Sequence, residues 1–173
     1  MSLLLAILAP GSVEAEIGRV QERIFTDHGL VSSIALPPLV PVSFLSEAAP
    51  LRGLLSKLNR GVAAPYRISV AGLLWHDGWL YLAVDSGGLW RSLRAAAPGE
   101  AAGPFAVFEG FFLGCEEAGG VRREEIRPPL PAIGFTSSTL AVVRIDAGSP
   151  GTGWWRDVST EVVDEMPLRG RRG

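Results

Sequence analysis

The chain has 173 residues, 47% of them apolar and 20% charged, so it is long enough to form one domain with its own hydrophobic core. The 16 basic and 18 acidic residues give a formal net charge of -2, which excludes nucleic-acid binding by bulk charge alone. Cys115 is the single cysteine, so no disulfide can form within the chain, and we expect a cytoplasmic location. No apolar run approaches the roughly 18 residues of a membrane helix, so we expect no contact with a membrane.

The first half of the chain alternates predicted strands and helices. Residues 3–8 form a continuous apolar run without the basic flank of a signal peptide, which predicts a buried strand. Ser12 is a candidate N-cap for a helix over residues 13–25, where apolar residues recur every three or four positions, and Gly29 is a candidate C-cap. Residues 33–45 predict a strand that three prolines confine to an edge or a bulge. A second helix is expected over residues 47–58.

The second half is richer in strands. Two apolar segments joined through Asp77-Gly78 predict a β-hairpin, because both residues tolerate a positive φ. A short helix should end near Ala97. The remaining predicted strands cover residues 105–113, 139–146 and 155–163. This order of elements predicts an α+β fold.

The two halves of the chain also resemble each other. The segment 3–11 and the segment 79–87 are both apolar strands that end in a glycine-containing turn before a helix. Residues 39–46 and 107–114 form the second repeated strand, and acidic residues follow both. A duplicated strand-helix-strand unit usually brings equivalent strands together around a groove.

With Leu4 to Pro10 leading into a helix that carries Val20-Gln21-Glu22-Arg23-Ile24, this repeat resembles the 2H phosphoesterase superfamily, which includes LigT-like RNA ligases and cyclic phosphodiesterases. The resemblance implies duplicated β-α-β lobes that form two antiparallel sheets around a central groove, with the helices outside. It implies a single domain over residues 1–168, followed by a basic tail at residues 169–173.

Members of this superfamily carry a His-x-Thr/Ser motif in each lobe. Two imidazoles act there as general base and general acid on a phosphodiester, while the hydroxyl groups hold the phosphate. In this chain, the first motif position holds Leu39 and Pro41 in place of the histidine and the hydroxyl residue. The second holds Val107 and Glu109.

Another register places the second motif at Ala132 and Gly134, and it recovers no histidine either. His28 follows a predicted helix and His76 lies in a predicted turn, so neither replaces a missing catalytic group. We therefore expect no catalytic residues of the family type, no metal and no cofactor.

Glu109 interrupts an apolar strand, which suggests either a groove carboxylate with a function or an ordinary side chain that faces solvent on an edge or pairs with an arginine such as Arg67 or Arg144. We favour the ordinary role. Acidic neighbours of Cys115 should raise the pKa of its thiol, which favours a structural role.

Two further segments have both a functional and a structural interpretation. The turn Asp85-Ser86-Gly87-Gly88 precedes a helix and could bind an anion, although helix capping is the expected role. Trp154-Trp155 could stack on a base or a partner at the rim of the groove, and core packing of at least one ring is expected.

We expect a protein that binds rather than cuts, with a groove more apolar than a phosphate site and with Ser43 and Phe111 as neighbours of the motif positions. A protein segment or an apolar small molecule is the favoured ligand, and a nucleotide or RNA end is the second choice. One alternative is a phosphodiester hydrolase that uses Glu109 as general base. Another is a structural or assembly protein that exposes the proline-rich strand over residues 36–42.

Overall fold

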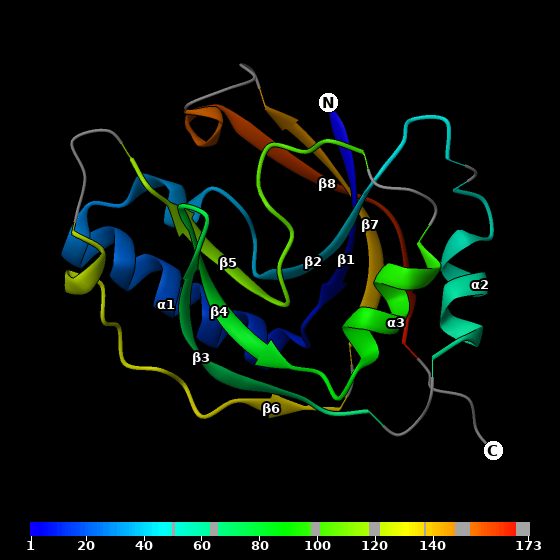
Figure 1. Ribbon diagram of the computed structural model, residues 1–173, viewed down its shortest axis with the longest axis horizontal. Helices are drawn as coiled ribbons and strands as arrows, with labels where there is room; N and C mark the ends of the chain where they lie inside the picture. Colours follow the sequence, from blue (N-terminus) through cyan, green and yellow to red (C-terminus); the bar gives the residue numbers. More distant parts are fainter. Residues whose placement is uncertain are drawn as a thin grey trace.

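The computed structural model describes residues 1–49, 51–62, 66–97, 101–117, 122–136, 138–147 and 153–168. The predicted basic tail, residues 169–173, lies outside the described residues. Two antiparallel four-stranded sheets form the fold, with strand orders β2-β1-β7-β8 and β5-β4-β3-β6 (Figure 1). The elements in chain order are β1 (Ser2–Leu8), α1 (Gly11–His28), η1 (Val31–Ile34), β2 (Leu39–Leu45), α2 (Leu54–Arg60), β3 (Ile68–His76), β4 (Trp79–Asp85), α3 (Leu89–Ala96), β5 (Gly110–Cys115), η2 (Arg123–Glu125), β6 (Gly134–Phe135), β7 (Thr139–Ala147), η3 (Trp154–Arg156) and β8 (Val158–Pro167).

The expected α+β fold of two antiparallel sheets with helices outside is confirmed. Each sheet contains one strand-helix-strand unit whose two strands are neighbours: β1-α1-β2 in the first sheet and β4-α3-β5 in the second. No helix in the described part of the chain is long and apolar enough to cross a membrane.

Local sequence explains the best-predicted elements. α1 ends at Gly29, whose φ of 69° is left-handed and whose N–H bonds to the Phe25 carbonyl, as the C-cap prediction requires. The helix begins one residue before Ser12, because the carbonyl of Pro10 accepts the first hydrogen bonds and Pro10 takes the N-cap position. The β3–β4 hairpin turns at Asp77 (φ 48°) and Gly78 (φ 81°), so this prediction is confirmed too.

Four boundaries differ from the predictions. Pro37 and Pro38 keep residues 35–38 out of the ladder, so β2 begins at Leu39 after a short 3-10 turn. The second helix begins at Leu54 rather than residue 47. The predicted strand over residues 105–113 begins only at Gly110, because residues 101–109 leave the sheet. β8 runs from residue 158 to 167, later than predicted, because Trp154 and Trp155 form a 3-10 turn.

The two faces of the sheets carry two separate apolar clusters. One cluster, on the helix side, joins α1 to both sheets through Ile17, Val20 and Ile24. The other, which we call the groove cluster, lies on the opposite face. Its buried members are Leu4, Ala6, Leu36, Leu39, Phe44, Tyr81, Phe105, Phe112, Ala141, Val143, Ile145 and Trp154.

Candidate functional site

The candidate site is the junction of the two sheets, where β2 and β5 lie next to each other as the end strands of their sheets. Each strand pairs with its neighbour through one bulge. Pro41 lies opposite Ala6 and Ser43 opposite Leu5, so Val42 is the extra residue in β2. In the second sheet, Phe112 lies opposite Tyr81 and Gly114 opposite Leu80, so Leu113 is the extra residue in β5.

The two bulges give the internal register of the repeat. Aligning Val42 with Leu113 makes Gly110 the counterpart of Leu39 and Phe112 the counterpart of Pro41. This register differs by three residues from the sequence alignment, which pairs Leu39 with Val107. Both registers leave the second motif position without a histidine.

Leu39 and Pro41 face the groove cluster. Pro41 lies opposite Ala6, a buried member of that cluster, and Leu39 is itself a member with 0% of its surface exposed. In β5, Phe112 belongs to the same cluster, while Phe111 and Leu113 pack on the helix side. The side of the sheets expected to hold a ligand is therefore buried at these positions.

Aromatic side chains from outside the sheets fill this face. The ring of Phe105 stacks on Trp154 with centroids 5.6 Å apart, and it lies 5.1 Å from Phe44 and 5.2 Å from Phe112. Phe105 comes from the segment between α3 and β5, which crosses in front of the first sheet in Figure 1. A phosphate group has no room in this packed cluster.

The free edge of β2 is also closed. Its carbonyl groups accept hydrogen bonds from the indole of Trp90 (to Pro41, 2.7 Å), the guanidinium of Arg94 (to Val42, 3.4 Å) and the N–H of Ala101 (to Phe44, 3.0 Å). These bonds tie α3 and the segment after it to the strand that carries Leu39 and Pro41.

At two glycines, neighbouring segments pack so closely that a side chain would clash. A Cβ atom at Gly103 would lie 2.0 Å from the ring of Phe44, so the crossing segment rests directly on that ring. A Cβ atom at Gly110 would lie 2.7 Å from the Leu82 carbonyl oxygen and 3.0 Å from the Ala83 Cα. Because both of these atoms are backbone, no side chain fits at Gly110 without a movement of β4.

The remaining predicted site residues lie elsewhere. Val107 packs partly buried against the groove cluster, before β5 begins. Phe111, expected beside the groove, lies on the helix side, because alternate residues of a strand face opposite ways. Ser43 is buried opposite Leu5, whose side chain is also in the helix-side cluster.

Glu109 precedes β5 and binds neither Arg67 nor Arg144 in the structure. Its carboxylate accepts hydrogen bonds from the N–H and the hydroxyl of Ser86, which is 1% exposed. The expected pair with an arginine is therefore wrong, since Arg144 pairs with Glu161 instead. Glu109 connects the segment before β5 to the turn before α3.

The alternative register is excluded by topology. Gly134 lies in β6, at the far edge of the second sheet, with β3 and β4 between it and β5. His28 ends α1, and His76 is exposed with its ring 5.3 Å from Phe108. Neither histidine lies in the groove cluster.

The titratable groups near the groove are poor acids and bases. Burial raises the pKa of the Tyr81 hydroxyl above its ordinary value, and that hydroxyl donates to the Ala106 carbonyl. Burial also raises the pKa of the Cys115 thiol to about 11, so at neutral pH the group is a thiol rather than a nucleophilic thiolate. Within the described ranges, no three His, Cys, Asp or Glu residues gather to hold a metal ion.

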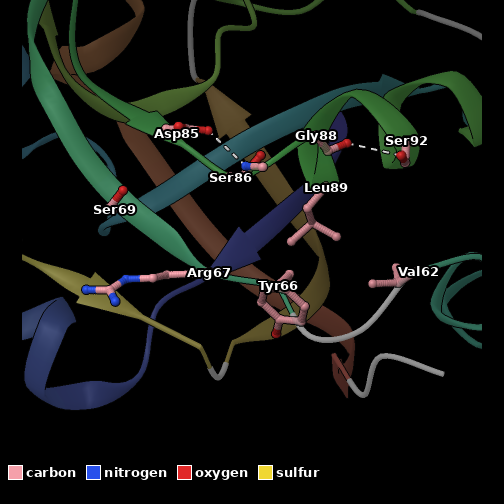
Figure 2. A pocket seen from close by; sticks show the side chains of 10 residues that line it. Val62, Tyr66, Arg67, Ser69, Asp85, Ser86, Gly88, Leu89 and Ser92 are labelled. Atoms are coloured by element: carbon pink, nitrogen blue, oxygen red, sulfur yellow. Dashed lines mark hydrogen bonds between the residues drawn. The ribbon is translucent and has the colours of Figure 1, made fainter. Parts of the chain in front are cut away.

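A small hollow of about 380 Å³ lies beside the turn Asp85-Ser86-Gly87-Gly88 (Figure 2). The Gly87 N–H bonds to the Asp85 carboxylate (2.9 Å), and the Ser86 hydroxyl accepts from the Trp90 N–H (3.0 Å). The second bond satisfies an N–H in the first turn of α3, and although Arg67 also lines the hollow, the carboxylates of Asp85 and Glu109 disfavour an anion at this helix end. The turn therefore acts as a helix cap.

A larger cavity, about 710 Å³, borders the groove cluster at Ile145 and Trp154. Its walls are Met1, Ser2, Asp77, Gly78, Trp79, Ala102, Gly103, Pro104, Cys115, Glu116, Ile145, Ala147, Trp154 and Trp155. We call it the tryptophan cavity. Its volume suits a small organic ligand.

The sequence did not predict that Phe105 and Phe112 pack together in the groove. The signal was present as a dense aromatic stretch, in which Phe105, Phe108, Phe111 and Phe112 fall within eight positions. Such a density exceeds what one face of a strand can bury, so part of it had to pack elsewhere.

Two solved structures share this fold. TT0787 of Thermus thermophilus superimposes with a TM-score of 0.67 at 18% identity, over 99% of this chain and 100% of that chain. LigT of E. coli, solved in complex with 3'-AMP, superimposes with a TM-score of 0.62 at 18% identity, over 96% and 97%. No protein-family model matches the sequence, and no curated protein does. The chain therefore has the LigT-like fold that the sequence resemblance implied.

Proposed function

We propose that this protein is a 2H phosphoesterase-like protein that does not catalyse a reaction, and that it binds a small organic molecule in the tryptophan cavity. The observation that carries the proposal is the groove face of β2 and β5. Leu39, Pro41, Gly110 and Phe112 stand at the four positions that we assign to the two motifs, and the ring of Phe105 packs 5.2 Å from that of Phe112.

The proposed loss of catalytic activity follows from the absence of a general acid and a general base at the motif positions. General acid and general base each typically contribute about 10²–10⁴-fold to a rate, and none of the four assigned positions, Leu39, Pro41, Gly110 and Phe112, carries an imidazole or a carboxylate. A histidine at position 110 would collide with the backbone of β4, so a single reversion does not restore the second motif.

The ligand site supports a small molecule over the other candidates. A nucleotide of the kind bound by LigT carries a phosphate, and the ionised groups among the cavity's described side chains are the carboxylates of Asp77 and Glu116. The proline-rich strand, proposed as an assembly surface, is buried from Leu39 to Leu45. The hollow beside Pro37 and Pro38, about 290 Å³, is small and includes the carboxylates of Glu14 and Glu165 in its wall, which does not favour an apolar protein segment.

A turnover assay tests the proposal. The purified protein is incubated with 2',3'-cyclic nucleotides and with a linear dinucleotide, and the products are separated by chromatography. We expect no product above the rate in buffer. Turnover that co-purifies with the protein and is lost in Glu109→Gln would overturn the proposal in favour of the hydrolase alternative.

A further inference from the structure

The tryptophan cavity has an unusual concentration of indole rings. The centroids of Trp79 and Trp154 lie 6.4 Å apart, and Trp155 meets Trp154 edge to face at 85°. Gly78, Ala102, Gly103, Pro104 and Ala147 complete the wall with small residues, so the rings dominate its surface.

These rings offer carbon surface rather than hydrogen-bond donors. The indole Nε1 atoms of Trp154 and Trp155 are buried and have no hydrogen-bond partner. Because those N–H edges have almost no accessible surface, a molecule in the cavity meets ring faces and carbon edges. Ring faces carry the negative part of the aromatic quadrupole and attract cations.

The charged groups at the mouth of the tryptophan cavity also favour a cation. Asp77 and Glu116 both line the cavity, and no lysine or arginine is among the described lining residues. Glu116 is paired with the Arg123 guanidinium through two hydrogen bonds, at 2.9 and 2.7 Å, which lower the pKa of its carboxyl group and offset its negative charge, so the remaining carboxylate is that of Asp77. The α-amino group of Met1 lies 3.9 Å from Asp146, which offsets its positive charge.

We infer that the tryptophan cavity binds an organic cation of the quaternary ammonium type, held over the partly exposed rings of Trp79 and Trp155 with the carboxylate of Asp77 near its charge. This inference rests on the proposed function, because it names the ligand class of the same cavity. The described walls hold no lysine or arginine side chain for an anion, and a neutral molecule gains only the apolar contact.

Acetylcholine and its uncharged isostere 3,3-dimethylbutyl acetate test the inference, because they differ in charge but hardly in shape. Binding of each to the full chain is measured by calorimetry and by tryptophan fluorescence. We expect the cation to bind about tenfold more tightly than the isostere. Trp155→Leu, at a partly exposed ring, should weaken cation binding at least about fivefold, and Asp77→Asn should weaken it about threefold.

Trp90→Phe is the matched control, because it removes an indole outside the cavity and should leave cation binding unchanged. Equal affinity for the two probes would overturn the cation assignment while leaving a small-molecule site in place. Absence of binding by either probe, or tighter binding of 3'-AMP in the cavity, would also overturn it. Failure of the proposed function is detected separately, as turnover in the phosphodiester assay.

Discussion

Truncation of Phe105 to alanine tests whether the groove is filled by the protein's own side chains. The ring is 5% exposed and lies within 5.6 Å, centroid to centroid, of Phe44, Phe112 and Trp154. Loss of such a buried ring removes its transfer free energy and leaves a cavity, which together cost about 3–5 kcal/mol. For a chain of this size, the melting temperature should fall by roughly 6–20 °C.

Urea unfolding followed by circular dichroism measures the loss. The matched control is Phe25→Ala, which removes the same ring from a position that is 40% exposed on α1 and should cost under about 1 kcal/mol. If Phe105→Ala costs no more than Phe25→Ala, the ring does not pack in the groove and the closure described above is wrong.

Three other predictions concern polar and titratable groups. Glu109→Ala should lower the free energy of unfolding by about 1–3 kcal/mol in the urea assay, because Ser86 is buried and loses its hydrogen-bond acceptor. The control, Glu124→Ala on the surface, should change the free energy of unfolding by less than about 0.5 kcal/mol. Burial raises the pKa of Cys115 to about 11, so its alkylation by iodoacetamide at pH 8 should be at least about a hundredfold slower than that of a free thiol; equal rates would refute the burial. The free energy of unfolding should also fall as the pH rises above 9.0, the ordinary pKa of the thiol, because the unfolded chain then loses protons that folded Cys115 and Tyr81 keep. Melting curves from pH 8 to 11 measure this effect. They would show the opposite slope if either group were ionised in the folded protein.

The sequence was most informative where local chemistry decides the structure. The Asp77-Gly78 turn, the apolar stripe of α1 and its glycine C-cap are determined by neighbours in the chain, and each was predictable. The fold class followed from the order of such elements. The repeat predicted that equivalent strands meet, and β2 and β5 do lie next to each other.

The register of the second motif strand was not predictable from the sequence, for a physical reason. A bulge adds one residue to a strand and shifts the face of every residue beyond it, and nothing in Val42 or Leu113 marks it. The sequence alignment therefore selects Val107 and Glu109, whereas alignment of the two bulges selects Gly110 and Phe112.

Long-range contacts account for the other error. The packing of Phe105 on Trp154 joins segments almost fifty residues apart, and no local pattern specifies which apolar residues leave the sheet. The arginine partners proposed for Glu109 failed for the same reason, since Ser86 became its neighbour only through the turn before α3.

A crystal structure grown with a high concentration of a nucleoside monophosphate tests the central claim most directly, because it shows the groove and any occupant together. We predict that the Phe105 ring lies on Trp154 and that no nucleotide lies against Leu39 and Pro41. A nucleotide bound at those residues, with Phe105 displaced from the groove, would contradict the account.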